Sequence, residues 1–191
     1  MNIILGSNSP RRKELLGGLG IVFEVRVLPD ISENFPENLP VDETALYIAR
    51  EKAEAYKPLL QEDDLVITAD TVVVCGQEVL GKPVDADDAR RMLRLLSGRT
   101  HHVITGVCLT MAACQRVFSV STEVTFKQLS DEEINYYINK YQPFDKAGAY
   151  GIQEWIGYIG VTGLKGSYFN VMGLPVQRIY EELRKLGAFN Y

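Results

Sequence analysis

The sequence predicts an α/β fold with a mixed sheet, organised as one domain with two lobes. Short apolar runs typical of buried strands alternate with segments whose apolar residues recur at helical spacing. The 191 residues are about 1.3 times a typical domain length, and neither a repeat nor a clean linker divides them. The content of 46% hydrophobic and 24% charged residues is ordinary for a globular protein. It excludes disorder, collagen-like repeats and disulfide-dense miniproteins.

The first half of the chain supplies short strands and three helices. The expected strands are residues 2–5, 21–28, 65–69 and 71–75. The first helix starts at Pro10 and stops before Gly20, and the second, over residues 42–56, is Ala-rich and ended by Pro58. Residues 29–40, rich in Pro, Asn and Asp, form a loop, and residues 76–77 form a hairpin turn. A third helix runs from an Asp85 cap to about residue 96.

The second half begins with long paired strands at residues 102–111 and 116–126. Ser130 and Glu133 form a capping box that opens a helix to about residue 141. A loop over residues 143–153 follows. We then expect a Gly-punctuated β pair at residues 155–161 and 167–172, and a last helix from Pro175 to about residue 186.

The composition excludes several partners. A net charge of −5 gives no whole-protein reason to bind nucleic acid or an anionic membrane, so a polyanion site must be a local cationic cluster. The three cysteines lack C-x-x-C spacing, which favours reduced, structural thiols. No stretch approaches the ~18 apolar residues of a membrane span, and the first residues are too short an apolar run for a signal peptide. A cytoplasmic location is the default expectation.

Cations at the start of the first helix are the sharpest anomaly. Ser9 is a good N-cap and Pro10 a good first residue, after which Asp or Glu would be favoured by the helix dipole. The chain instead places Arg11, Arg12 and Lys13 there. Free N–H groups of a helix N-terminus, together with two guanidinium forks, would bind an oligophosphate. The alternative is that the arginine side chains extend into solvent.

Asp70 is a lone carboxylate between two apolar β-rich runs, where burial is costly without a partner. At a strand end facing a phosphate site, it would bind a divalent metal or activate water. A structural aspartate that caps the strand end is the alternative. Glu33, in the loop of residues 29–40, is a candidate second acidic group, although loop glutamates are usually solvated.

Two lysines are candidate phosphate ligands. Lys52 lies on the apolar side of its helix, where it either snorkels to solvent or carries its charge into a cleft. Lys82, between Gly and Pro at the end of the expected hairpin, is presented rigidly. Neither a P-loop nor a G-x-G-x-x-G motif is present. His101 and His102 are strand neighbours that point to opposite faces, which fits poorly with a shared metal.

A series of motifs in order along the chain resembles the Maf family. The run Ser7-Asn8-Ser9-Pro10-Arg11-Arg12 corresponds to the S-x-S-P-R-R opening of that family. The later matches are Glu33, residues 49–53 (AREKA), 69–71 (ADT), 81–83 (GKP), 97–101 (SGRTH), 145–153 (DKAGAYGIQ) and 171–175 (VMGLP). The resemblance implies a single domain over residues 1–191 with two lobes around a cleft. The implied fold is an elongated mixed sheet flanked by helices, similar to inosine triphosphatases.

The resemblance also implies a nucleoside triphosphate pyrophosphatase that releases a nucleoside monophosphate and pyrophosphate. The segment ending in Gln153 is similar to the subgroup that acts on dTTP and UTP. Asp70 is then the general base, and Glu33 and Asp70 are the expected ligands of Mg²⁺ or Mn²⁺. The expected substrate-binding residues are Ser7, Arg11, Arg12, Lys52, Thr71, Lys82 and Gln153.

Two other functions stay open at this point. One is a nucleotide-binding regulator of cell division without significant turnover, because the family name comes from septum inhibition. The other is a phosphodiesterase or phosphatase that uses the same metal site. We expect a small-molecule nucleotide as ligand, no nucleic-acid or membrane partner, and a homodimer. The sequence departs from the family pattern at Glu154 and Trp155, which replace a small, Gly-led stretch.

Overall fold

The computed structural model describes residues 1–189. Its strands are β1 (Asn2–Leu5), β2 (Glu24–Val25), β3 (Asp64–Cys75), β4 (Glu78–Leu80), β5 (Thr100–Met111), β6 (Gln115–Phe126) and β7 (Val161–Lys165). Its α-helices are α1 (Pro10–Gly17), α2 (Thr44–Tyr56), α3 (Ala86–Leu96), α4 (Asp131–Tyr141), α5 (Trp155–Gly160), α6 (Tyr168–Met172) and α7 (Val176–Lys185). Two 3₁₀ turns are η1 (Lys57–Leu59) and η2 (Ala147–Ala149). None of these helices is long and apolar enough to cross a membrane.

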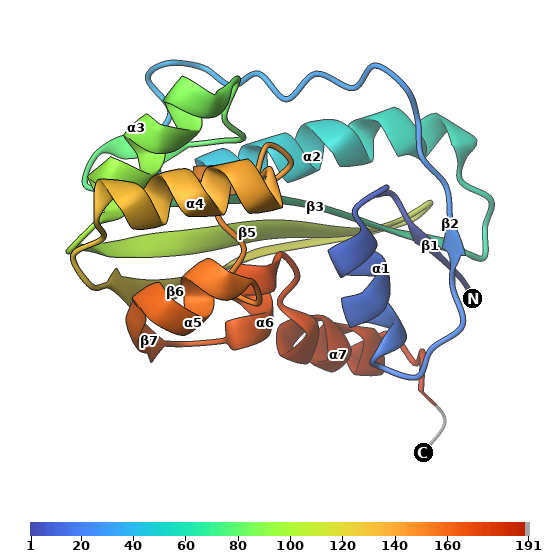
Figure 1. Cartoon of the computed structure of the whole chain (residues 1–191). Coiled ribbons are helices and arrows are strands. Elements are labelled where there is room, and N and C mark those ends of the chain that lie inside the picture. Colours follow the sequence, from blue (N-terminus) through green and yellow to red (C-terminus); the bar gives the residue numbers. More distant parts are fainter. Residues whose placement is uncertain (190–191) are drawn as a thin grey trace. The chain divides into compact units, whose positions relative to one another are not determined.

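The strands of the described residues form one seven-stranded mixed sheet (Figure 1). Its order is β2-β1-β3-β5-β6-β7, with β4 paired to β3. β1 runs parallel to both β2 and β3, whereas β4 is antiparallel to β3 and β7 is antiparallel to β6. The predicted α/β class with a mixed sheet flanked by helices is confirmed.

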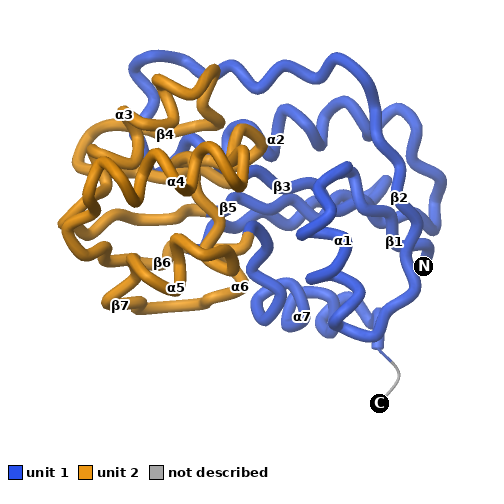
Figure 2. Tube along the Cα trace, in the orientation of Figure 1, with its two compact units in different colours: residues 1–70, 105–120, 173–191 blue, residues 71–104, 121–172 orange. Residues whose placement is uncertain are grey.

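The chain divides into two compact units (Figure 2). Unit 1 contains residues 1–70 and 105–120 and the described chain from residue 173 onward. Unit 2 contains residues 71–104 and 121–172. The three long strands β3, β5 and β6 each contribute residues to both units. The expectation of one domain over residues 1–191, with two lobes around a cleft, stays a prediction, and its last two positions lie outside the described residues.

In unit 1, α2 covers one face of the sheet. Tyr56, at the end of α2, packs against Ile4 and its cross-strand neighbour Val66. Earlier in the helix, small alanines at positions 49 and 53 pack against Cys108 of β5. Small residues on that face let the helix backbone lie close to the sheet, which matters for the site described below.

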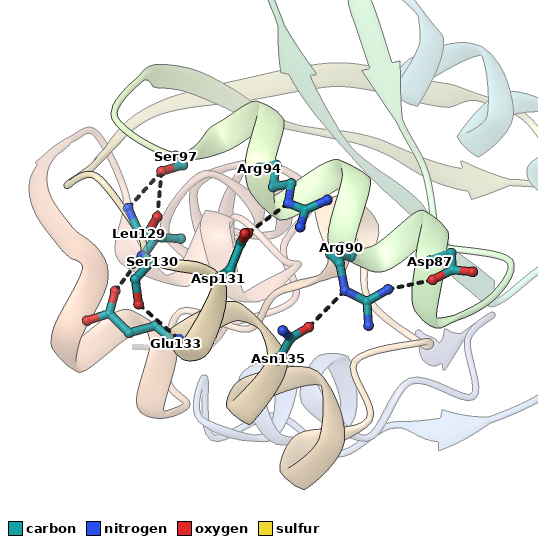
Figure 3. A network of polar contacts seen from close by, with 9 residues as sticks. All are labelled: Asp87, Arg90, Arg94, Ser97, Leu129, Ser130, Asp131, Glu133 and Asn135. Carbon is teal, nitrogen blue, oxygen red and sulfur yellow. Dashed lines mark hydrogen bonds and ion pairs between the residues drawn. The ribbon is translucent and has the colours of Figure 1, made fainter.

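Unit 2 has its own hydrophobic core, in which strand residues such as Val103 and Val124 pack with α3, α4 and the start of α5. Polar contacts fix α3 against α4 at their solvent side (Figure 3). The Arg94 Nε donates to Asp131 at 2.8 Å, and the Arg90 Nε donates to Asn135 at 2.8 Å. The predicted capping box of α4 is present, with Ser130 and Glu133 bonded reciprocally.

Several expected elements differ in the structure. The predicted strand over residues 21–28 is reduced to β2, whose two residues are both exposed and therefore have little apolar area to bury. The two runs around Asp70 form one continuous strand, β3, so Asp70 lies within a strand and not at its end.

The predicted β pair at residues 155–161 and 167–172 is wrong. Those segments contain the short helices α5 and α6, and β7 lies between them. Tertiary packing overrides the β propensity of this segment. Ile156 of α5 is completely buried in the unit 2 core, and a Cβ on Gly157 would lie 1.7 Å from the Ile152 carbonyl oxygen. Only glycine permits that approach.

Candidate active site

The loop after β1 and the first turn of α1 hold two serines in place. Ser9 is the N-cap of α1, as predicted, and its side chain accepts a hydrogen bond from the Arg12 backbone N–H at 3.4 Å. The Ser9 N–H in turn donates to the Ser7 Oγ at 3.2 Å. The first turn of α1 carries no acidic residue among those described. The positive end of the helix is therefore not neutralised by its own first turn.

The side chain of Arg12 does not extend into solvent. Its Nε donates to the Gly173 carbonyl at 2.9 Å, and its Nη1 donates to the Ala69 carbonyl at 2.9 Å. Burial lowers the pKa of the Arg12 guanidinium, and the nearby Asp70 carboxylate opposes this effect. Arginine stays charged in proteins. Arg12 therefore places a positive charge beside Asp70 while it ties α1 to the residue that precedes Asp70.

Lys52 joins the two predicted acidic residues. Its Nζ lies 2.8 Å from the Asp70 Oδ1 and 2.8 Å from the Glu33 Oε1. The side chains of Lys52 and Asp70 are each only 13% exposed, whereas that of Glu33 is 48% exposed. The alternative in which Lys52 snorkels to solvent is therefore wrong. The structure of unit 1 brings together three candidates from α2, β3 and the loop between β2 and α2.

Two contacts that sequence reasoning missed place Lys52 at this distance from Asp70. The Thr68 Oγ1, two residues before Asp70, donates to the Ala49 carbonyl of α2 at 2.8 Å. A Cβ on Gly106 of β5 would lie 2.4 Å from the backbone of Leu46, so only glycine lets β5 approach α2 this closely. A glycine within an apolar strand often marks a close backbone approach. That signal was present in the sequence.

The charges of this cluster balance. Lys52 and Arg12 are cationic, and Glu33 and Asp70 are anionic. Within residues 1–189, no group of three or more His, Cys, Asp or Glu side chains could hold a metal ion. Mg²⁺, however, is commonly held by one or two carboxylates, with substrate phosphates and water as its remaining ligands. The oxygen donors of Glu33 and Asp70 fit that mode of binding.

Of the other predicted site residues, Arg11 lies in the first turn of α1 in unit 1, and Thr71, Lys82 and Gln153 belong to unit 2. Thr71 is partly buried in β3, and Lys82 is exposed just after β4. The Gly148 N–H donates to the Gly81 carbonyl at 3.0 Å, which connects the Lys82 loop to the segment that carries Gln153. Gly148 has a φ of +69°, and a Cβ there would lie 2.8 Å from Val73 of β3. Within unit 2, this hydrogen bond joins the two loops, and the close approach of Gly148 to Val73 packs them against β3.

Gln153 is unusual for its unpaired amide oxygen. Its Oε1 is buried and has no hydrogen-bond partner among the described residues. A buried acceptor without a partner costs about 1–3 kcal/mol, so such atoms are rare in folded proteins. An amide carries both an acceptor and two donors. The side chain can therefore form two hydrogen bonds to a ligand that presents a donor beside an acceptor.

The fold and the chain have clear relatives. The structure of the Staphylococcus aureus Ham1 protein matches with a TM-score of 0.50 at 16% identity, covering 95% of this chain and 100% of that one. This likeness concerns the fold, which is therefore of the Ham1 type, as the expected similarity to inosine triphosphatases implied. A family model described as "Maf-like protein" matches residues 2–186, and the chain belongs to the Maf family.

Two bacterial relatives are similar over nearly their whole length. A protein of Phocaeicola vulgatus is 65% identical over 96% of this chain and 95% of its own, and is named dTTP/UTP pyrophosphatase. A protein of Porphyromonas gingivalis with the same name is 57% identical over 98% of this chain and 96% of its own. The resemblance found in the sequence is confirmed.

Proposed function

We propose that this chain hydrolyses nucleoside triphosphates, with dTTP and UTP preferred, to the nucleoside monophosphate and pyrophosphate. Membership of the Maf family supports the reaction, and the names of relatives at 65% and 57% identity support the substrates. The observation that carries the chemistry is the position of Asp70, 2.8 Å from Lys52 and next to the charged fork of Arg12. A carboxylate held in this way is a candidate general base.

Asp70 would accept a proton from water. The Lys52 Nζ donates to its Oδ1, which fixes the carboxylate, and an ionised carboxylate has further lone pairs to accept the proton. The water oxygen forms a bond to the α-phosphorus, and the bond from that phosphorus to the bridging oxygen breaks. Pyrophosphate leaves with the electron pair. Positioning of the water and the phosphates supplies most of the acceleration in such displacements.

The triphosphate would be held by cations and hydroxyls. The proposed ligands are Ser7, Arg11, Arg12 and Lys52 of unit 1 and Lys82 of unit 2. Arg12 has a further, structural task, because two of its N–H groups bond the Ala69 and Gly173 carbonyls. Mg²⁺ or Mn²⁺, held by Glu33 and Asp70, would neutralise charge on the phosphate oxygens.

Gln153 and Thr71 would contact the base. Thymine and uracil present an N3–H donor beside the O4 acceptor, and the amide of Gln153 offers the complementary pair. The buried Oε1, unpaired within the described chain, supports this role because the N3–H would satisfy it.

Product identification tests the proposal. The protein is incubated with MgCl₂ and each of UTP, dTTP, ATP, GTP and CTP, and the products are separated by ion-exchange chromatography. We expect UMP or dTMP together with pyrophosphate, at higher rates than with the other nucleotides. Orthophosphate as the product would indicate a phosphatase, and binding without any product would indicate the nucleotide-binding regulator. Either result contradicts the proposal.

The expected homodimer, the cytoplasmic location and the lack of nucleic-acid or membrane partners stay predictions. Sedimentation equilibrium of the purified chain tests the first of them. A mass near twice the 21.4 kDa of one chain is expected.

A further inference from the structure

The segment that carries Gln153 is fixed by a buried polar network in unit 2. This segment connects α4 to α5 (Figure 1). The Tyr137 hydroxyl of α4 accepts a hydrogen bond from the Gly151 N–H at 3.0 Å and donates to the Glu154 Oε2 at 2.8 Å. The Lys146 Nζ lies 2.9 Å from the other oxygen of Glu154. We call Tyr137, Lys146 and Glu154 the Glu154 network.

The members of the Glu154 network are well shielded from solvent. Tyr137 is completely buried, and the side chains of Lys146 and Glu154 are 11% and 19% exposed. Burial raises the pKa of the Tyr137 hydroxyl, which therefore stays protonated and can donate to the carboxylate. Hydrogen bonds to charged groups in such surroundings are about twice as strong as neutral ones. The network is thus a firm anchor for the backbone that it contacts.

The Glu154 side chain bonds within this network and does not cap the helix that follows it. Glu154 is the N-cap residue of α5, yet its side chain makes no capping bond among the described residues. The carboxylate turns instead to Tyr137 and Lys146. A Cβ on Gly151 would lie 2.9 Å from the Lys146 Cε and 3.1 Å from the Glu154 Oε1, so the backbone passes directly over the ion pair.

Gln153 therefore lies between two anchored positions. Gly151 is bonded to Tyr137 on one side, and Glu154 is bonded to Tyr137 and Lys146 on the other. Between them, the Ile152 carbonyl packs against Gly157, which has no side chain. The backbone of Gln153 has little freedom, which narrows the positions open to its side chain, and its Oε1 has no hydrogen-bond partner in the described chain.

The orientation of an amide decides which base it prefers. Uracil offers an N3–H donor beside an O4 acceptor, and adenine offers the reverse, an N1 acceptor beside an N6 donor. An amide pairs with either base if it can turn over, because it carries an acceptor and donors. Only a fixed amide discriminates between the two. A rigid backbone under Gln153 restricts the positions from which its amide can meet a base, and this restriction can favour one of the two pairings.

We propose that Glu154, held by Tyr137 and Lys146, is a positioning residue that fixes the Gln153 amide and thereby sets the preference for uracil and thymine over adenine. The inference rests on the proposed function, because it assumes that Gln153 contacts the base. It assigns a role to a position at which the sequence departs from the Maf pattern.

Two substitutions break the network. Tyr137→Phe removes only the hydroxyl, and Glu154→Ala removes the carboxylate while Lys146 keeps its contact with Asp145. Tyr136→Phe is the matched control, since it makes the same change one residue away on a side chain that is 42% exposed. Glu154→Gln keeps an acceptor for Tyr137 and should therefore retain part of the preference for UTP over ATP.

The first readout is the ratio of kcat/KM for UTP to that for ATP. We expect a fall of about fivefold to tenfold in Tyr137→Phe and Glu154→Ala, in keeping with the loss of one well-formed hydrogen bond to the base. Tyr136→Phe should stay within twofold of the wild type. In the Gln153→Ala background, Glu154→Ala should cost no further selectivity, because it acts through Gln153. If the double variant instead loses selectivity by the product of the two single-variant losses, the inference is overturned.

The second readout needs no turnover. The side-chain amide ¹⁵N signals of Gln153, assigned by comparison with Gln153→Ala, should show an ordered group in the wild type and in Tyr136→Phe. They should show a mobile group in Tyr137→Phe. Unchanged amide order in Tyr137→Phe overturns the inference whatever the nucleotide preference is. A wild type that hydrolyses UTP and ATP equally contradicts the proposed function, and with it the selectivity role, even if the amide is ordered.

Discussion

Asp70 in unit 1 and Gln153 in unit 2 are both shielded from water, yet their surroundings differ. The Asp70 carboxylate is bonded to Lys52 and lies close to the Arg12 guanidinium. The Gln153 Oε1 is buried without a partner in the described chain. An unpaired buried charge costs several kcal/mol, whereas an unpaired neutral acceptor costs about 1–3 kcal/mol. A charged group therefore needs partners within its own unit, and a neutral amide can be left for a ligand to satisfy.

This difference suggests a division of labour between the two units. With the exception of Lys82, the charged groups of the proposed reaction lie in unit 1, where they would act on the phosphates that all nucleotides share. The neutral amide lies in unit 2, where it can act on the base that distinguishes them. Changes at Asp70 should then affect all substrates equally, and changes at Gln153 should affect their ratio.

The largest effect is expected for Asp70→Asn. Loss of the general base should lower kcat by about 10²–10⁴-fold for every nucleotide, because proton transfer to a positioned base contributes that much. Nucleotide binding, measured by calorimetry, and thermal stability should change little, since asparagine has nearly the same shape, keeps an oxygen that accepts from Lys52, and leaves Lys52 its contact with Glu33. Asp63→Asn, a change on an exposed residue of the same unit, is the control. Pyrophosphate release near the wild-type rate would remove Asp70 from the mechanism.

The next largest effect is expected for the pH dependence of stability, because unit 2 keeps His101 neutral. His101 is completely buried, with its Nε2 2.7 Å from the Tyr150 hydroxyl. Burial, with a smaller contribution from His102, lowers the pKa of His101 from 6.5 to about 4. Between pH 4 and pH 6.5, the unfolded chain therefore binds a proton at His101 more readily than the folded protein does. Stability is complete above about pH 6.5 and falls, by up to about 3 kcal/mol, as the pH drops towards 4.

Urea unfolding between pH 4 and pH 7 measures this loss. His101→Phe should abolish most of the dependence on pH in that range, whatever its effect on stability at pH 7. His102→Phe, which alters an exposed neighbour, should keep it. An unchanged slope in His101→Phe would show that the unit 2 core does not hold a neutral histidine.

Lys52→Met tests whether the Glu33 and Asp70 carboxylates need the Lys52 cation for the stability of unit 1. It leaves the Glu33 and Asp70 carboxylates without the cation that both contact at 2.8 Å. Breaking a fully buried pair costs 3–5 kcal/mol, and the partial exposure of this cluster reduces the expected loss to about 2 kcal/mol. Lys57→Met removes an exposed ion pair with Glu54 and should cost less than about 1 kcal/mol. Equal free energies of unfolding for the two variants would contradict the account.

The smallest effect is expected for Gln153→Ala. The ratio of kcat/KM for UTP to that for ATP should fall about tenfold, while the rate with ATP changes little, because one hydrogen bond to the base is lost. The melting temperature should not fall, since the Oε1 loses no partner within the described chain. Gln77→Ala, in the exposed β3–β4 turn, is the control. A uniform loss on all nucleotides would argue against base reading.

Elements with local signals could be predicted from the sequence. The Ser9 and Asp85 caps and the Ser130 capping box are all present, because each depends on residues within one helical turn. The prediction of a β pair at residues 155–161 and 167–172 is wrong because the conformation of α5 depends on distant packing, namely the burial of Ile156 in the unit 2 core. Local propensity carries no information about such contacts.

The same limit applies to the candidate site. The residue types of the site could be named from motifs, but the bonds that arrange them could not. Arg12 bonds the carbonyl of Gly173, 161 residues away along the chain, and Thr68 bonds Ala49 across two elements. The partners of Glu154 were likewise invisible, because Tyr137 lies 17 residues before it.

A competition assay tests the division of labour most directly. Equal concentrations of UTP and ATP are mixed with the wild type, Asp70→Asn or Gln153→Ala, and the initial ratio of UMP to AMP is measured by chromatography. This ratio equals the ratio of the two kcat/KM values and does not depend on how much enzyme is active. The account predicts an unchanged ratio at a much lower rate of both products for Asp70→Asn. For Gln153→Ala it predicts a ratio about tenfold lower, with the rate of AMP formation little changed. An altered ratio in Asp70→Asn together with an unaltered one in Gln153→Ala would contradict it.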